Sequence, residues 1–257
     1  MRTPILAGLA LGLAACATTP APSEPQALVD RSALTVQELL SAENDRLDAA
    51  AALRRARGVL VCPRRFRAAF FGGGEGGGCV LLGRDAAGSW SSPAFYALGA
   101  ASFGFQAGIQ DSQTILLLMN DRALESVLRD QFKLGAEASL AFASFGGAVE
   151  GGTTTNLGAD VLAFSRSRGL FAGLAIEGTV LTPQAEWNAA YYGRPVAPRE
   201  IVVDMAAHNP GADPLRGALL RFGAARAAAA PPAGGRVPAT GAQAAAVSRQ
   251  ALPPPPR

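Results

Sequence analysis

Histidine and lysine are almost absent from this sequence. His208 is the single histidine, and Lys133 is the single lysine among 23 basic residues. One histidine excludes a site built from several histidines, and one lysine leaves a single candidate for Schiff-base or phosphate-loop chemistry. The net charge of +3 is too small for a dedicated nucleic-acid binder, which usually carries a strongly basic surface. No apolar run reaches 18 residues, so we expect no transmembrane helix.

Recognisable catalytic and metal-binding patterns are also missing. The sequence has no Gly-x-Ser-x-Gly motif, no cysteine pair at zinc spacing and no calcium loop. Gly72, Gly74 and Gly77 fit the spacing of a dinucleotide-binding loop, but an apolar, strand-like segment follows them where that loop needs a helix. A hairpin or a close backbone approach explains these glycines better. We therefore expect no enzyme activity, cofactor or metal; a hydrolase whose carboxylates meet only in the fold is the alternative.

The first residues are typical of an exported protein. Arg2 precedes an uncharged stretch over residues 4–15, as in a secretory signal peptide over residues 1–15. The following Cys16 completes a segment, Leu13-Ala-Ala-Cys16, that resembles the bacterial lipobox. This resemblance predicts an acylated Cys16, a flexible tether over residues 16–33 and, from Ala17, attachment to the outer membrane facing the periplasm. An ordinary signal peptide that happens to contain a cysteine is the alternative.

The far end of the chain has little to bury. Residues 223–257 contain 13 Ala, 7 Pro and 4 Gly, with four arginines and no acidic residue. A segment of this composition is expected to be disordered. The folded domain is therefore expected over residues 34–222.

Within that domain, a helix is followed by segments of strand periodicity. Thr35 and Glu38 form a capping box with Leu34 and Leu39 as its staple, and the helix extends toward Arg57, with a break near residues 41–44 left open. Strands are expected at 59–62, 79–82, 102–110, 114–119, 138–145, 160–165 and 170–177, with a connector at 63–67 and short helices near 121–134 and 183–191. These elements predict one α+β domain with a mostly antiparallel β-sheet, an N-terminal amphipathic helix and short helices.

Two features of the strand region leave two interpretations each. Cys62 and Cys79 lie in apolar runs, where they form either a disulfide or two buried thiols. Six arginines and a phenylalanine lie close together, and they make either a solvated helix end or an anion-binding surface. The members of this arginine cluster are Arg54, Arg55, Arg57, Arg64, Arg65, Phe66 and Arg67.

Several segments, in this order and spacing, resemble the SYLF domain of bacterial lipoproteins and of eukaryotic lipid- and actin-associated proteins. They cover residues 56–63, 71–84, 88–95, 102–108, 134–135 and 165–173, and the likeness extends over about residues 34–205. The chain departs from the family pattern at Cys62, where an aromatic residue is more usual, and at Cys79. Trp90 and Phe95 are expected to fill the core.

The resemblance implies a lipid-binding protein. In eukaryotic members an amphipathic helix and basic residues in the N-terminal part bind phosphoinositides, which points here to the arginine cluster. Anionic phospholipid of the cell envelope is the expected partner, and neither actin nor nucleic acid is expected. The alternative is an envelope lipoprotein that binds another protein and has no lipid affinity beyond its acyl anchor.

Overall fold

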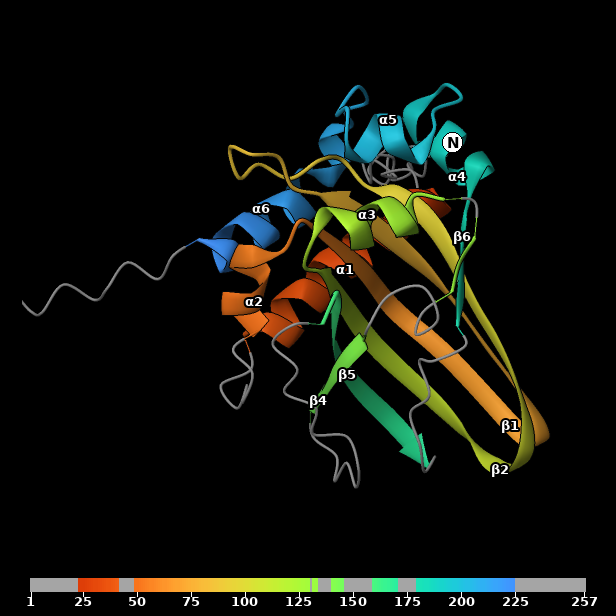
Figure 1. Ribbon diagram of the computed structural model, residues 1–257. Coiled ribbons are helices and arrows are strands. Elements are labelled where there is room, and N and C mark those ends of the chain that lie inside the picture. The colour runs from red at the N-terminus through yellow and green to blue at the C-terminus, as the bar shows by residue number, and fades with distance from the viewer. Residues whose placement is uncertain are drawn as a thin grey trace, which may run out of the picture. The chain divides into compact units, whose positions relative to one another are not determined.

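The computed structural model describes residues 23–41, 49–129, 131–133, 140–145, 159–170 and 179–224. Cys16, the expected signal peptide, the first part of the expected tether and residues 225–257 lie outside the described residues. The described part is an α+β domain built on one mostly antiparallel sheet, which confirms the predicted fold class (Figure 1). None of its helices is long and apolar enough to cross a bilayer.

The sheet is built around two very long strands. These are β1 (Gly58–Gly83) and β2 (Ala94–Leu118), which pair antiparallel over nearly their whole length. Four shorter strands complete the sheet: β3 (Phe132–Lys133), β4 (Leu140–Phe145), β5 (Val161–Leu170) and β6 (Val180–Pro183). The order is β3-β6-β2-β5-β4, with β1 on β2, and β4–β5 is the parallel pair. In Figure 1 the β1–β2 ribbon runs to its far end, bends and returns.

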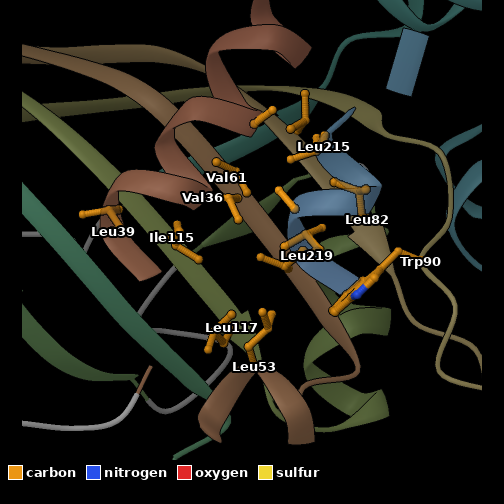
Figure 2. Close-up of a cluster of buried hydrophobic side chains, with 14 of the residues drawn as sticks. Val36, Leu39, Leu53, Val61, Leu82, Trp90, Ile115, Leu117, Leu215 and Leu219 are labelled. Atoms are coloured by element: carbon orange, nitrogen blue, oxygen red, sulfur yellow. The ribbon is translucent and has the colours of Figure 1, made fainter. Parts of the chain in front are cut away.

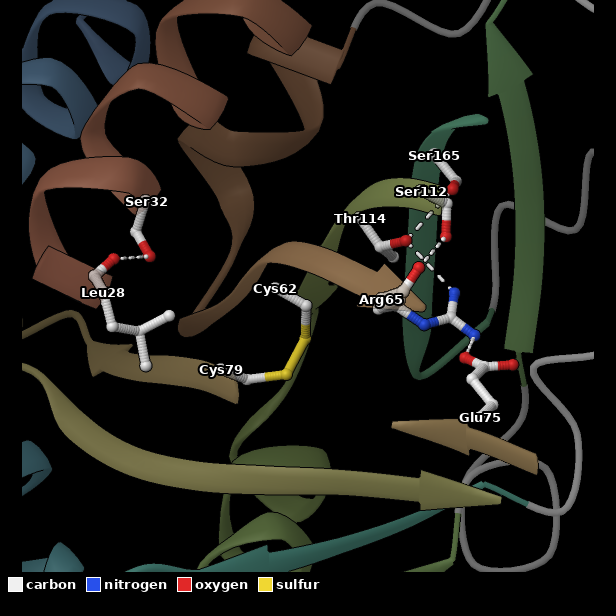
Figure 3. Close-up of a disulfide and its surroundings, with 9 residues drawn as sticks. All are labelled: Leu28, Ser32, Cys62, Arg65, Glu75, Cys79, Ser112, Thr114 and Ser165. Carbon is white, nitrogen blue, oxygen red and sulfur yellow. Dashed lines mark hydrogen bonds and ion pairs between the residues drawn. A yellow bond between two sulfur atoms is a disulfide. The ribbon is translucent and has the colours of Figure 1, made fainter. Parts of the chain in front are cut away.

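Strand β1 folds back beside itself. Its first arm, residues 58–70, and its second arm, residues 72–83, are separated by a register shift at the bend. The Cα atoms of Cys62 and Cys79 are 4.2 Å apart, close to the spacing of residues facing each other on neighbouring antiparallel strands. At the open end of the fold the Arg84 amide donates to the Arg57 carbonyl at 2.8 Å. The two cysteines form a disulfide between the arms (Figure 3), which decides between the two interpretations left by the sequence.

The predicted connector at residues 63–67 is wrong, because these residues continue β1. Pro63 cannot donate a backbone hydrogen bond, and the sheet accommodates it at a bulge between Cys62 and Arg65. A proline and three arginines look like a turn in the sequence. The bulge lets the strand continue through them.

Helices cover both faces of the sheet. On one face lie α1 (Glu24–Leu40), α2 (Ala49–Arg55), α4 (Ala185–Tyr192) and α6 (Asp213–Gly223), with a short 3₁₀ turn, η1 (Pro210–Ala212), before α6. Figure 2 shows the core beneath them, which includes Val61, Leu82, Ile115, Leu117 and Trp90. The other face is covered by α3 (Asp121–Val127) and α5 (Pro198–Val202), over alternate residues of the same strands such as Leu60 and Leu116. Alternation along β1 and β2 thus supplies both cores.

The first helix begins well before the predicted capping box. Ser23 caps α1, and its side chain accepts a hydrogen bond from the Gln26 amide. Leu28 and Val29 are buried with Val36 and Leu39, so the apolar stripe extends into the predicted tether. Leu34, the predicted staple residue, is instead 64% exposed in mid-helix. Helix α1 ends at Ser41, within the range of the possible break, and α2 is a separate helix.

The glycine run 72–78 lies within β1, and one of its members permits the contact between the arms. A Cβ atom on Gly77 would lie 2.4 Å from the backbone oxygen of Arg64 in the other arm. Neither backbone can yield without moving a paired strand. A Cβ on Gly74 would meet nothing within 4 Å. The close approach expected for these glycines is therefore real at Gly77, and it does not extend to Gly74.

This difference gives a matched pair of variants. We expect Gly77→Ala to lower the free energy of unfolding by about 1–3 kcal/mol, the usual cost of overpacking. Gly74→Ala should leave stability unchanged or slightly raised, because alanine suits a strand interior better than glycine. Chemical denaturation of the two variants measures this difference. Equal stability would contradict the close contact between the arms.

Candidate functional site

The structure does not bring the arginine cluster together on one surface. Arg54 and Arg55 end α2, and Arg57 lies just before β1. Along the first arm of β1 the residues then alternate: Arg64 and Phe66 are exposed on the α1 side, whereas Arg65 and Arg67 are buried on the opposite side. Strand alternation, which the predicted connector concealed, divides the cluster in this way.

Arg65 belongs to a buried polar network (Figure 3). Its side chain is 1% exposed and forms an ion pair with Glu75 of the second arm, which is 4% exposed. Its Nη1 also donates to Thr114 Oγ1 at 3.1 Å, and Thr114 contacts Ser165 of β5 at 3.0 Å. Burial lowers the pKa of the Arg65 guanidinium from its usual value, while Glu75 opposes that shift. Arg65 therefore links the two arms internally, and the prediction that it contacts lipid is wrong.

The arginines near α2 mainly hold local structure. Arg57 Nε donates to Asp121 of α3 at 2.7 Å. Arg84 donates to the Arg54 carbonyl at 2.5 Å and lies over the buried Trp90 ring at 5.6 Å. Trp90 is 1% exposed, as expected of a core residue. Arg55 is exposed at the end of α2.

An apolar surface lies on the α1 side of the sheet, toward the bend and past the end of the helical cover. Phe66 is 43% exposed, Phe70 is 72% exposed, and Ile109 of β2 is 61% exposed. Phe66 and Phe70 are four residues apart on β1, and Ile109 pairs with Ala68 midway between them, so the three side chains share one face. We call these three residues the aromatic patch. Large exposed apolar side chains gathered on one face mark an interaction surface.

Charged groups surround the aromatic patch. Arg64 Nε donates to Asp111 Oδ2 at 2.7 Å. Arg166 and Arg168 of β5 both pair with Glu38 of α1, at 2.8 Å and 3.3 Å. A hydrogen bond from Gln113 first, and then the two arginines, lower the pKa of Glu38 below its ordinary value. Three guanidinium groups and two carboxylates leave this surface weakly positive.

An open groove adjoins the aromatic patch between α1, α4 and the two arms of β1. Its volume is 450 Å³, within the range of small-molecule sites. Two cations line it, Arg31 of α1 and Arg64 of β1, and Gly76, Gly77 and Gly78 form its glycine side. Leu28, Phe66 and Trp187 supply apolar surface, and Pro63 completes the lining. Phe66 therefore belongs to both the groove and the aromatic patch, and Arg64 lines the groove and lies beside the patch.

Little in the described residues resembles a catalytic centre. Among the described residues, no group of three or more His, Cys, Asp or Glu is placed to hold a metal. The Ser92 hydroxyl lies 3.5 Å from His208 Nδ1, at the limit of a hydrogen bond. The pKa of Glu38 is lowered toward the ionised form, the opposite of what a general acid requires.

The sequence missed parts of this site. Ile109 lies in the strand predicted over residues 102–110, but no local pattern shows that its apolar side chain is 61% exposed. Arg31 lay in the expected tether, and Trp187 in a short helix without an assigned role. The apolar stripe of α1 continues back to Leu28 in the sequence. This pattern could have placed Arg31 on the helix beside β1.

The buried ion pair yields a stability test. We expect Glu75→Gln to lower the free energy of unfolding by about 3–5 kcal/mol, because it leaves the Arg65 charge buried without its counter-ion. Adding Arg65→Met should restore most of this loss, since the buried charge is then gone. Urea denaturation of the single and double variants measures both effects. A double variant that is less stable than Glu75→Gln alone would contradict this account.

Comparison with known proteins places this fold in a family. Residues 99–222, from within β2 to α6, match the family model Ysc84, described as "Las17-binding protein actin regulator". The mouse "SH3 domain-containing YSC84-like protein 1" is 28% identical over 188 residues, which cover 71% of this chain and 55% of that protein. The yeast "Protein YSC84" is 29% identical over 166 residues, or 63% of this chain and 35% of its own length.

A second yeast protein, "LAS seventeen-binding protein 3", is 30% identical over 166 residues, covering 63% of this chain and 36% of the relative. The matched region thus spans about half of the animal relative and about a third of the yeast relatives. The names of the family and of this relative describe binding and regulatory proteins. The order of segments noted in the sequence, the α+β sheet that they form and these matches agree, and the chain belongs to the Ysc84 family of SYLF-domain proteins.

Proposed function

We propose that this chain is a membrane-anchored lipoprotein of the bacterial envelope whose SYLF domain binds anionic phospholipid without catalysis. The observation that carries the proposal is the aromatic patch, in which Phe66, Phe70 and Ile109 are exposed together on one face of the sheet. Arginines beside them favour an anionic bilayer over a neutral one. The lipid contact thus lies on β1 and β2, and of the arginine cluster it uses Arg64 and Phe66.

Apolar insertion contributes more to this binding than charge does. Transferring one such side chain from water to an apolar medium stabilises by about 1.5–3 kcal/mol when complete, so three partly exposed ones supply roughly 4 kcal/mol. Each arginine near an anionic surface adds about 1 kcal/mol, and Asp111 and Glu38 offset much of that. A total of about 5 kcal/mol corresponds to a dissociation constant of roughly 0.2 mM. That is weak alone, and sufficient for a domain already held at the membrane.

The anchor in this proposal is an acylated Cys16. Six residues lie between Cys16 and Ser23, where the described domain begins, and the seven Cα-to-Cα steps from one to the other span at most about 25 Å in an extended chain. The domain therefore stays within reach of the bilayer that holds its acyl chains. The disulfide between Cys62 and Cys79 supports an oxidising compartment such as the periplasm. The residue after the anchor, Ala17, favours the outer membrane.

A protein partner is the second candidate. The yeast relative named "LAS seventeen-binding protein 3" is named for binding a protein, and an exposed apolar patch also suits a protein interface. In this version the aromatic patch contacts another envelope protein, and the acyl anchor is the only lipid contact. Neither actin nor nucleic acid is proposed as a partner.

Vesicle binding distinguishes the two candidates. The mature chain, residues 16–257 with Cys16→Ser to prevent acylation, should bind vesicles containing phosphatidylglycerol more tightly than pure phosphatidylcholine vesicles. Phe70→Ser together with Ile109→Ser should weaken binding at least about tenfold, because about 1.4 kcal/mol or more of apolar transfer is lost. Raising the salt concentration should weaken it only a few-fold, since the nearby arginines are partly neutralised. Co-sedimentation measures all three effects.

Leu220→Ser is the matched control, because Leu220 is 47% exposed on α6, outside the aromatic patch. It should leave vesicle binding unchanged. Absence of binding to every vesicle would overturn the lipid proposal and favour a protein partner. If the patch variant and the control variant lose vesicle binding equally, the aromatic patch is not the lipid-binding site.

A further inference from the structure

Glycines of the second arm of β1 form one side of the groove beside the aromatic patch. Gly76 and Gly78 are alternate residues of the second arm of β1, and a Cβ on Gly78 would point at Leu28 of α1, 3.1 Å away. A Cβ on Gly76 would meet only the Leu98 carbonyl oxygen, at 3.9 Å. Side chains at these two positions would project into the space between α1 and the sheet. Glycine at position 78 allows Leu28 to pack close to the strand, and glycine at position 76 adds no side chain to the groove of 450 Å³.

The charged lining of the groove is positive. Arg31 and Arg64 enter it from different elements, α1 and β1, and its lining contains no carboxylate. Asp111 holds Arg64 through Nε at 2.7 Å. This contact orients the guanidinium and leaves its two terminal nitrogens without a described partner. Two guanidinium groups around one open space favour a phosphate, which each can bind through paired hydrogen bonds.

The remaining lining is apolar. Leu28, Phe66 and Trp187 come from three separate elements, and Phe66 also belongs to the aromatic patch. A free inorganic phosphate would use the arginines and leave these three side chains in contact with water. A ligand with a phosphate at one end and hydrocarbon beside it would use both kinds of surface.

We propose that this groove binds one anionic phospholipid molecule, with its phosphate between Arg31 and Arg64 and its glycerol and upper acyl region along Leu28, Phe66 and Trp187. This deepens the proposed lipid function and rests on it. The aromatic patch contacts the bilayer surface, and the groove takes a single headgroup from that bilayer. Phe66, shared by both, connects the two.

A soluble short-chain lipid tests the groove without a bilayer. The probe is dihexanoylphosphatidylglycerol below its micellar concentration, added to the mature chain with Cys16→Ser. The chain has two tryptophans; Trp90 is 1% exposed in the core, so a change in emission on binding reports Trp187. We expect saturable binding that Gly76→Leu weakens at least about tenfold by filling the groove. Arg31→Ser should weaken it about tenfold as well, as expected for loss of a charged hydrogen bond.

Each variant has a matched control. Gly74→Leu adds the same side chain to the same face of the same strand, two residues outside the groove, where a Cβ has no neighbour within 4 Å. Arg55→Ser removes an exposed arginine from α2. Both should bind the short-chain lipid within about twofold of the parent chain, a difference of less than half a kcal/mol.

The outcomes separate this inference from the function on which it rests. If the parent chain binds anionic vesicles but not the short-chain lipid, or if Gly76→Leu binds that lipid as well as Gly74→Leu does, the groove proposal is overturned and the patch remains. If glycerol 3-phosphate binds as tightly as the lipid, the groove is a small-phosphate site and the proposal is also wrong. If neither vesicles nor the short-chain lipid bind, both proposals fail.

Discussion

The folding of β1 back beside itself is the constraint on which the rest of the structure depends. It brings Cys62 to Cys79 and Arg65 to Glu75, and it requires a residue without a side chain at Gly77. Strand β2 follows the same path, because it pairs with both arms. The later part of β2 pairs with β5, and its earlier part pairs with β6. The remaining strands of the sheet are thus arranged around this fold-back.

The fold-back also sorts charged residues between the interior and the surface. Successive arginines on the first arm point to opposite faces, so Arg64 faces solvent while Arg65 meets the second arm. A buried guanidinium such as that of Arg65 needs a counter-ion, and the same bend brings Glu75 beside it. The interacting surface then consists of what the helices leave uncovered on the α1 side: the aromatic patch and the groove.

The sequence predicted element types and the family better than it predicted where strands connect. Hydrophobic alternation identified the strands at 59–62 and 79–82, yet Pro63 and the glycine run looked like breaks between them. A bulge and a close backbone approach keep both within one strand, and these depend on a partner strand that no local pattern reveals. The prediction of a single arginine surface is wrong for the same reason. Strand alternation divides the arginines between two faces, and the sequence did not show that residues 63–67 belong to a strand.

Exposure at the aromatic patch depends on helix length, which local periodicity cannot give. Val61 and Ile115 are buried with Val36 and Leu39 of α1, whereas Ile109 is 61% exposed, so one alternating apolar face is core at one end and surface at the other. Gly76 adds no side chain to the groove beside this boundary, and Gly78 allows Leu28 to pack close to β1. A fold that needed only to be stable could fill that space with side chains. An open, positively lined space beside exposed aromatic residues is the arrangement that a phosphate-bearing amphiphile fits, because its two ends match the two kinds of lining.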